Sequence, residues 1–382
     1  MSGRRQGAGE RVLVVRLDSD GDVLLAGPAV RALAADDGVA QVDLLVSPAG
    51  RHAAELLPGV GEVLAFAAPW SGSRPPPVDA AAVQALVADL AERAYDRCLV
   101  LTSFHQSPLP MALLARLAGV PFVAGTSEDY PGALLDVRHR RPHGLHEVEA
   151  ALDLVRATGV AVASGTHPLA VRGPLPDVAA LVGTGAVAGP DGHPGSGRPY
   201  VVLHPGASVP SRALSGQHAA AIARALADAG HGVVVTGGPG ETGLTAAVVA
   251  AATQAGPAAT RTPPVVDLGG RTTFAELAAV LAGASCVVVG NTGPAHLAAA
   301  VGTPVVSLFS PVVPADRWAP WGVPTVLLGD QAAPCRDTRA RECPVAGHPC
   351  LTSVAPSEVV DAVAALTGRP AGVADVVVEA GA

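Results

Sequence analysis

Short aliphatic runs alternate with amphipathic segments along most of the chain, and polar turns separate the two. Such alternation predicts parallel sheets covered by helices on both faces, an α/β architecture. In the first half, strands are expected at residues 11–17, 41–46, 63–66, 97–101 and 122–124. Helices are expected there at residues 23–35, 50–57, 80–94, 108–117 and 147–158.

The same alternation restarts in the second half. Its expected strands are residues 200–203, 232–236, 265–268, 286–289 and 305–308, and its expected helices include residues 216–229, 244–253, 273–282 and 356–366. Between the halves, residues 185–198 are rich in Gly and Pro and have no periodicity, which is typical of a linker. We therefore expect a first domain over residues 1–175, a linker over 176–199, a second domain over 200–366, and an unpaired tail over 367–382.

Length and composition agree with two domains and exclude several classes of protein. A chain of 382 residues is long enough for two domains, and its 49% hydrophobic residues are mostly aliphatic. A net charge of −8 disfavours a general nucleic-acid binder. No apolar run approaches the roughly 20 residues of a membrane span, and residues 1–10 lack the apolar core of a signal peptide. We expect a cytoplasmic protein, and the pattern leaves peripheral contact with the inner face of the cell membrane open.

Two strand–turn–helix segments carry the clearest chemical signal. In residues 288–296 an apolar strand ends in a Gly-containing turn, and a helix with a histidine in its first turn follows. Backbone N–H groups and the helix dipole make such a turn a site for phosphate. Residues 11–25 repeat the pattern with a Ser/Gly/Asp turn. Two such units, far apart in sequence, predict two α/β domains facing one another across a cleft.

Four motifs occur in a specific order along the chain. They are Arg16…Gly21-Asp22-Val23-Leu24-Leu25…Pro28…Arg31-Ala32-Leu33, His204-Pro205-Gly206-Ala207, Gly237-Gly238-Pro239-Gly240-Glu241, and Gly290-Asn291-Thr292-Gly293-Pro294-Ala295-His296-Leu297-Ala298. Together they resemble glycosyltransferase family 9, the ADP-heptose:lipopolysaccharide heptosyltransferases, over residues 11–366. The resemblance implies the GT-B architecture of two Rossmann-like domains, and transfer with inversion at the sugar. It also implies an ADP-sugar donor on the second domain, a glycan or glycolipid acceptor on the first, and no metal or other cofactor.

Asp22 matches the catalytic base of that family. Inverting transfer needs a carboxylate that takes the proton of the acceptor hydroxyl. The alternative interpretation is a helix N-cap or a turn Asp at the start of the helix, both common roles for Asp. Asp18 and Asp20 are nearby candidates for the same task. Because residue 20 is more often apolar in the family, we expect the extra acid to raise the pKa of Asp22 by like-charge repulsion.

Asn291, Thr292, Gly293 and His296 match the motif that holds the donor phosphates. The resemblance implies that the N–H groups of Thr292 and Gly293 hold the diphosphate and that His296 neutralises the departing ADP. The family usually has Asp at position 291, so this departure bears on the identity of the donor sugar. The alternative is an ordinary turn with a capping Asn and a surface His.

Two further residues are candidate donor ligands. Arg212 aligns with a basic residue that reaches the diphosphate, where a guanidinium can bind two oxygens at once. Ser208 and Ser211, in the same loop, are further phosphate candidates. Glu241 matches an acidic residue that accepts the ribose hydroxyls. A surface Arg and a Glu favoured by a helix dipole are the alternatives.

Two clusters have no firm assignment from the sequence. The first is a basic group that either contacts an anionic acceptor or, as we favour, forms a solvated loop: His105, Arg138, His139, Arg140, Arg141, His143 and His146. The second is Cys335, Cys343, His348 and Cys350, either a zinc site or, as we favour, an irregular loop with reduced thiols.

Two other functions stay open beside the heptosyltransferase hypothesis. One is a GT-B transferase that uses another nucleotide sugar on a natural-product or cell-envelope acceptor. The other is a protein that binds a nucleotide sugar without turnover, against which the presence of Asp22 argues.

Overall fold

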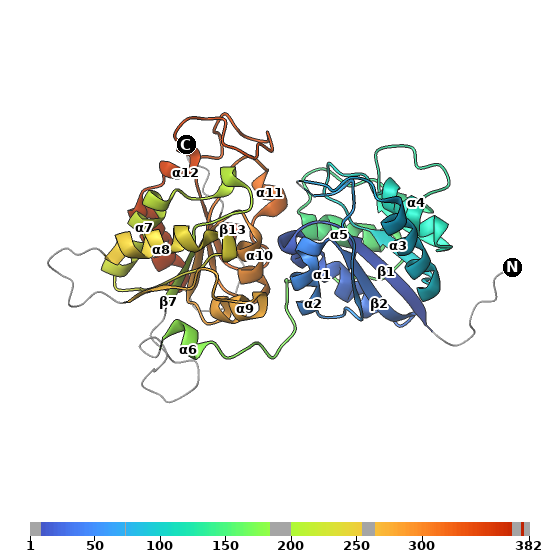
Figure 1. The fold of residues 1–382 in the computed structure, drawn as a ribbon, viewed down its shortest axis with the longest axis horizontal. Helices are drawn as coiled ribbons and strands as arrows, with labels where there is room; N and C mark the ends of the chain where they lie inside the picture. Colours follow the sequence, from blue (N-terminus) through green and yellow to red (C-terminus); the bar gives the residue numbers. More distant parts are fainter. Residues whose placement is uncertain (1–8, 73, 184–199, 254–263, 369–375, 378–382) are drawn as a thin grey trace. The chain divides into compact units, whose positions relative to one another are not determined.

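The protein divides into two units, each built on one parallel sheet with helices on both faces (Figure 1). The computed structural model describes residues 9–72, 74–183, 200–253, 264–368 and 376–377. The first unit spans Met1–Arg172 and the second Gly173–Ala382. The predicted α/β class with two Rossmann-like domains is confirmed.

The first sheet has the strand order β3-β2-β1-β4-β5-β6. Its members are β1 (Glu10–Arg16), β2 (Val39–Val46), β3 (Val63–Ala65), β4 (Arg97–Val100), β5 (Phe122–Thr126) and β6 (Val137–His139). The order reverses between β1 and β4, and ligands of open α/β sheets bind outside the carboxyl ends of strands at such a switch point. Both faces of β1 are covered, so Val12 to Val15 are fully buried.

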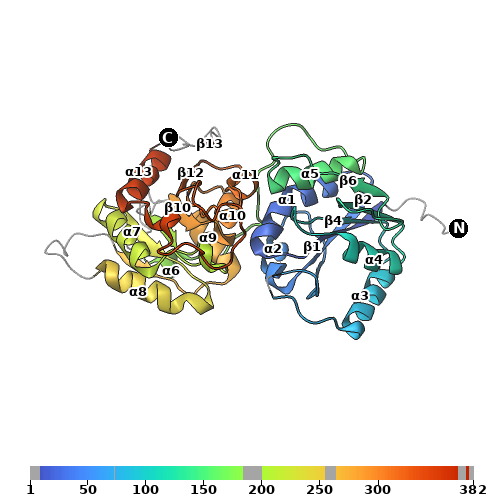
Figure 2. The same ribbon diagram turned by 90° about the horizontal axis from the view of Figure 1, so that it is seen from above.

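Helices cover this sheet on its two faces (Figure 2). They are α1 (Asp20–Ala34), α2 (Arg51–Leu56), α3 (Ala80–Arg93), α4 (Leu109–Leu117) and α5 (Glu147–Ala157). Leu13 and Val15 of β1 belong to one core cluster with residues of α3 and α4. Helices α1 and α5 pack against each other.

The second sheet has the order β13-β12-β11-β10-β7-β8-β9. Its members are β7 (Tyr200–His204), β8 (Gly232–Val235), β9 (Val265–Asp267), β10 (Cys286–Gly290), β11 (Val305–Leu308), β12 (Thr325–Leu328) and β13 (Val376–Val377). Every residue of β10 is buried, which explains its uninterrupted apolar run. The order reverses between β7 and β10, so the second switch point lies where the phosphate-type turn begins.

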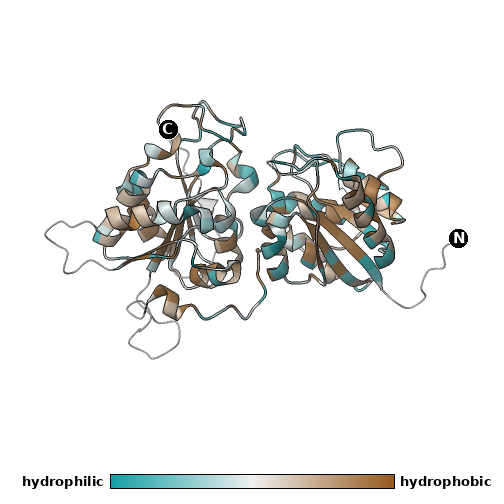
Figure 3. Ribbon diagram, viewed as in Figure 1, coloured by the Kyte–Doolittle hydropathy of each residue, from teal (hydrophilic) through white to brown (hydrophobic). Residues whose placement is uncertain are grey.

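The helices of the second unit pack around this sheet. They are α6 (Ala179–Val182), α7 (Gly216–Asp228), α8 (Thr242–Thr253), α9 (Phe274–Ala282), α10 (Gly293–Ala300), α11 (Ala315–Trp318), α12 (Pro349–Thr352) and α13 (Pro356–Thr367). Residues of α7, α8 and α13 form one core cluster with the central strands. In Figure 3 the strands of both sheets are largely brown and the outer helix faces carry more teal, as expected for sheets covered on both sides.

Several predicted boundaries need correction. The tail was expected to have no partner, yet β13 pairs with β12 in parallel. The predicted linker contains the short helix α6, and its residues 184–199 lie outside the described part of the chain. Strands β6 and β12 were missed: β6 has three residues, two of them polar, and β12 is an apolar run of only three residues after Thr325. Among the described residues, no helix has the length and apolar character needed to cross a membrane.

Candidate active site

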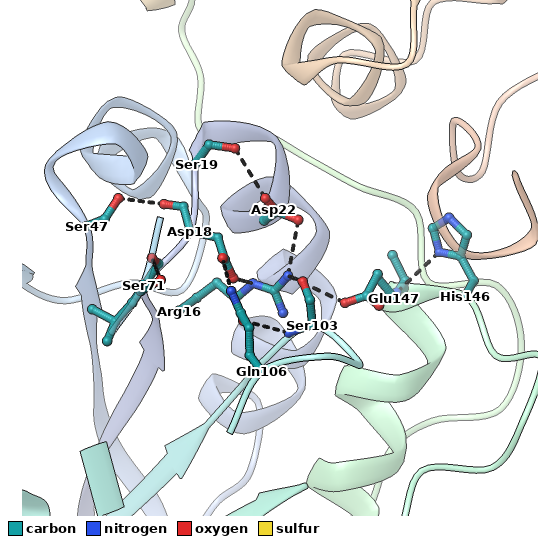
Figure 4. A network of polar contacts seen from close by, with 12 residues as sticks. Arg16, Asp18, Ser19, Asp22, Ser47, Ser71, Ser103, Gln106, His146 and Glu147 are labelled. Carbon is teal, nitrogen blue, oxygen red and sulfur yellow. Dashed lines mark hydrogen bonds and ion pairs between the residues drawn. The ribbon is translucent and has the colours of Figure 1, made fainter. Parts of the chain in front are cut away.

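Arg16 is the centre of a polar cluster at the carboxyl end of the first sheet (Figure 4). It is the last residue of β1 and only 4% exposed. Its Nε lies 2.9 Å from Oδ2 of Asp18, and its Nη2 lies 3.1 Å from Oδ1 of Asp22 and 3.4 Å from Oε2 of Glu147. The same Nη2 donates to Oγ of Ser103 at 2.8 Å. Segments that follow β1 and β4 thus meet the start of α5 at the switch point.

Asp22 lies in the first turn of α1 with its carboxylate 24% exposed. Its Oδ1 contacts Arg16, and its Oδ2 accepts a hydrogen bond from Oγ of Ser19 at 3.2 Å. Ser19 is the N-cap of α1, so Asp22 is not the N-cap, although it lies in the first turn of the helix as the alternative interpretation also allowed. The helix dipole favours a negative charge here. The result is an oriented, partly exposed carboxylate, which is the geometry a general base requires.

The other two acids of this turn face different partners. Asp18 accepts a hydrogen bond from Nε2 of Gln106 at 2.6 Å. Burial raises the pKa of Asp18 to about 6; Arg16 opposes this rise and the Asp22 charge adds to it. Asp20 accepts the N–H of Ala53 at 2.9 Å instead of facing Asp22. Asp18, which shares Arg16 with Asp22, is therefore the neighbouring acid in the cluster, whereas Asp20 was the expected like-charge neighbour.

Glu147 joins two arginines at the start of α5. Its side chain is 2% exposed, and its Oε1 lies 2.6 Å from Nη1 of Arg141. Arg141 also donates to the carbonyl of Leu145 at 2.6 Å. Arg16, Arg141 and Glu147 line a small pocket together with Thr102 and Thr126.

Part of the predicted basic group is built into the fold. His139 is buried between Oγ1 of Thr126, at 2.8 Å, and Oδ2 of Asp153, at 2.9 Å. His146 is the N-cap of α5 and is also buried. These two side chains and Arg141 are therefore occupied inside the unit, whereas His105, Arg140 and His143 are exposed, as the solvated-loop alternative expects.

Sequence reasoning assigned no role to Arg16, Ser103, Gln106 or Glu147. An arginine closing an apolar strand is a usable signal for the first, because a buried charge needs partners. Glu147 has no local signal, since it lies 131 residues from its partner Arg16.

In the second unit, the loop of Arg212 packs directly on the end of β10. A Cβ at Gly290 would lie 2.5 Å from the carbonyl oxygen of Arg212, so only glycine fits there. Ser211 is buried, and its hydroxyl donates to the carbonyl of Ala340 at 2.6 Å. Ser211 is thus occupied by the protein itself, whereas Arg212 lies beside the predicted phosphate turn.

Asn291, the only asparagine in the chain, ties this turn to the loop after β11. It is 5% exposed. Its Nδ2 donates to the carbonyl of Ser310 at 3.1 Å, and its Oδ1 accepts the N–H of Ser310 at 3.0 Å. Asn291 does not cap α10, because the N-cap is Thr292.

The predicted anion site at α10 is smaller than expected. The N–H of Thr292 donates to the carbonyl of Gly290 at 2.9 Å, so it is occupied by the chain in this structure. Gly293 is the first helical residue, and Pro294 next to it has no N–H to offer. His296 is buried in the first turn, at 6% exposed, and is not the surface histidine of the alternative interpretation.

Glu241 lies where the loops after β7 and β8 meet. Its Oε2 accepts the N–H of Gly238 at 2.7 Å and lies 3.8 Å from Nε2 of His204. Burial lowers the pKa of His204, against the opposing charge of Glu241. Strands β7, β8 and β10 are parallel and adjacent, so their carboxyl ends share one edge of the sheet. All the predicted donor residues, namely Arg212, Glu241, Asn291, Thr292, Gly293 and His296, follow these strand ends.

The cysteine cluster forms a loop packed on the second unit. Cys335 and Cys350 are buried, and Nε2 of His348 bonds to the carbonyl of Ser211 at 3.0 Å. Burial, with Cys335 and Cys343 nearby, raises the pKa of Cys350 to about 11. Within the described ranges, no group of three or more His, Cys, Asp or Glu is placed to hold a metal.

Comparison with known proteins identifies the family. The model of glycosyltransferase family 9 (heptosyltransferase) matches residues 83–347. The chain belongs to this family. A curated relative, lipopolysaccharide heptosyltransferase 3 of Escherichia coli, is 36% identical over 154 residues, which are 39% of this family 9 chain and 43% of the relative. The aligned part thus spans less than half of that relative.

Solved structures resemble this family 9 chain over nearly its whole length. ADP-heptose lipopolysaccharide heptosyltransferase II of E. coli has a TM-score of 0.68 at 21% identity, covering 94% of this chain and 98% of that one. A family 9 glycosyltransferase from Veillonella parvula has a TM-score of 0.69 at 16% identity, covering 94% and 97%. E. coli heptosyltransferase WaaC with ADP-2-deoxy-2-fluoro heptose has a TM-score of 0.62 at 22% identity, covering 92% and 98%. At these identities the structures establish a shared fold.

Proposed function

We propose that this chain is an inverting glycosyltransferase that moves a heptose, or a related sugar, from an ADP-sugar to a lipopolysaccharide-type or other glycan acceptor. Family membership supports the reaction class. The observation that carries the proposal is the Asp22 carboxylate, oriented by Arg16 and Ser19 and partly exposed at the switch point of the first sheet.

In the proposed reaction, Asp22 accepts the proton of the acceptor hydroxyl as its oxygen attacks the anomeric carbon. The bond from that carbon to the ADP oxygen breaks on the opposite face, and ADP leaves with the bonding electrons, so the configuration inverts. A positioned base of this kind contributes about 10²–10⁴-fold in rate. The acceptor would bind to the first unit, where Asp22 lies.

The donor would bind at the carboxyl edge of the second sheet. Arg212, the N-terminus of α10 at Gly293, and His296 would stabilise the charge of departing ADP. Glu241 would accept the ribose hydroxyls. Asn291 would act through its two bonds to Ser310, which hold the turn in place. These groups supply the charge stabilisation, so the proposal includes no metal. It places the reaction in the cytoplasm, at the membrane surface when the acceptor is a glycolipid.

Two assays test the proposal: the rate of sugar transfer tests the role of Asp22, and ADP affinity tests the donor site. We expect Asp22→Asn to lose about 10²–10⁴-fold in ADP release from ADP-heptose with heptose-deficient lipopolysaccharide core as acceptor. The same variant should retain the calorimetric affinity for ADP. Asp37→Asn, an exposed carboxylate after α1, is the matched control with unchanged rate. Full transfer by Asp22→Asn would show that Asp22 is not the base.

Asn291 supports one alternative donor class. Its amide replaces the carboxylate usual in the family, so a different nucleotide sugar is the second candidate. Titration with ADP-heptose, UDP-GlcNAc and GDP-mannose distinguishes the donors. Preference for a UDP- or GDP-sugar would retain the transferase and reject the heptose donor, whereas binding without turnover by the native chain would favour a non-catalytic protein.

A further inference from the structure

We propose that Glu147 and Asp18 are positioning residues that compete with Asp22 for the guanidinium of Arg16. Because of this competition, Asp22 is a stronger base than a carboxylate that pairs with an arginine alone. This inference rests on the proposed role of Asp22. It extends that role to two side chains that do not contact the reacting atoms.

Three oxygens compete for hydrogen bonds from Nη2 of Arg16. Nη2 of Arg16 carries two hydrogens. Three oxygens lie within 3.4 Å of it, namely Oγ of Ser103 at 2.8 Å, Oδ1 of Asp22 at 3.1 Å and Oε2 of Glu147 at 3.4 Å. Asp22 therefore does not receive the two parallel hydrogen bonds that make an arginine–carboxylate pair strong. Nε of Arg16 faces Asp18 instead, at 2.9 Å.

The charge balance of the cluster also indicates that the carboxylates compete for the arginines. Three carboxylates, on Asp18, Asp22 and Glu147, face the two guanidinium groups of Arg16 and Arg141. Carboxylates therefore outnumber guanidinium groups in the cluster, and each like-charged neighbour opposes the attraction of an arginine. The raised pKa of Asp18 arises mainly from burial, and the charges of Asp22 and Glu147 add to it.

Other titratable groups on the packed elements are engaged elsewhere. Asp20 on α1 bonds to the N–H of Ala53 and lies 3.8 Å from Nδ1 of His52. His146 on α5 accepts the N–H of Val148, and His139 on β6 contacts Asp153. The charge that Asp22 experiences thus comes chiefly from the members of the Arg16 cluster.

Glu147→Gln is the sharpest perturbation. The variant can keep the Oε1 that accepts from Arg141, and it replaces the oxygen facing Arg16 with an NH₂ group that accepts nothing. Arg16 then pairs more fully with Asp22, so the pKa of Asp22 falls by about one unit. Asp18→Asn acts in the same direction, because it also removes a carboxylate charge that competes for Arg16. The Oδ1 of the new side chain can still accept the hydrogen bond from Gln106.

Carbon-13 NMR of aspartate-labelled protein measures this pKa without any substrate. The Asp22 carboxyl signal is assigned by its loss in Asp22→Asn. We expect a lower Asp22 pKa in Glu147→Gln and in Asp18→Asn, and no change in Glu92→Gln, an exposed charge on α3. An unchanged or higher pKa in both variants would overturn the proposal, and Asp18→Asn alone decides if Glu147→Gln does not fold.

The pH profile of transfer supplies the second measurement. A weaker base that deprotonates earlier moves the acid limb of kcat/KM to lower pH by about one unit and lowers the plateau. A purely structural role for Glu147 would lower the rate at every pH and leave the limb in place, which contradicts the proposal. If Asp22→Asn itself retains full transfer, the proposed function fails while the NMR result still stands, so the two failures are distinguishable.

Discussion

Asn291→Asp tests the tie between the phosphate-type turn and Ser310. The wild-type amide donates to the carbonyl of Ser310 at 3.1 Å and accepts its N–H at 3.0 Å, in a site that is 5% exposed. An aspartate retains the acceptor and places a second oxygen against the carbonyl, which then has no donor. Leaving such a buried group unsatisfied costs about 1–3 kcal/mol.

The loss of folding stability in Asn291→Asp grows with pH. Burial and the facing carbonyl raise the pKa of the new carboxyl in the folded state above its unfolded value of about 3.9. Protonation of that carboxyl restores a donor, so the loss is small below the unfolded value and grows as the pH rises through the folded pKa. A rise of about 2 units corresponds to about 2.7 kcal/mol at neutral pH. For a domain of this size that equals a fall of roughly 5–10 °C in Tm.

Thermal unfolding followed by circular dichroism at about pH 4 and pH 8, on either side of the expected titration, measures the effect. We expect the Tm difference between Asn291→Asp and wild type to be larger at the higher pH. Gln217→Glu makes the same amide-to-acid change at an exposed position of α7 and should show no loss. Equal Tm values for Asn291→Asp and wild type at both pH values would refute the role of the amide.

Two further predictions concern the donor half. A Cβ at Gly206 would overlap Oε1 of Glu241, so Gly206→Ala should displace that carboxylate from Gly238. We expect ADP binding, measured by calorimetry, to weaken about tenfold or more. Gly243→Ala is the unaffected control, because a Cβ there meets nothing within 4 Å. An ADP affinity in Gly206→Ala equal to wild type would show that Glu241 does not contact the nucleotide. Dialysis against EDTA should leave the rate of transfer unchanged, and a loss restored by one added metal would contradict the metal-free mechanism.

The central strands illustrate what local pattern can predict. The uninterrupted apolar runs of β1 and β10 predict buried parallel strands, and the glycines after them predict tight turns into helices. Strand β6 lacks such a run, and the run of β12 is too short to identify a strand by its pattern alone. Both strands are stabilised by pairing with their neighbours. The start of α1 was placed at Val23 instead of Asp20, since the sequence does not distinguish which of Ser19, Asp20 and Asp22 is the cap.

The sequence by itself determined the fold class, the family resemblance and the identity of the candidate base, because these depend on periodicity and on motifs whose residues are close together in the chain. Tertiary structure alone decided which groups surround Asp22. Arg16 and Glu147 are 131 residues apart, and they meet because parallel strands bring all their carboxyl ends to one edge of the sheet. Burial at that edge requires every charge to find a partner, and such pairing leaves no mark on the local sequence.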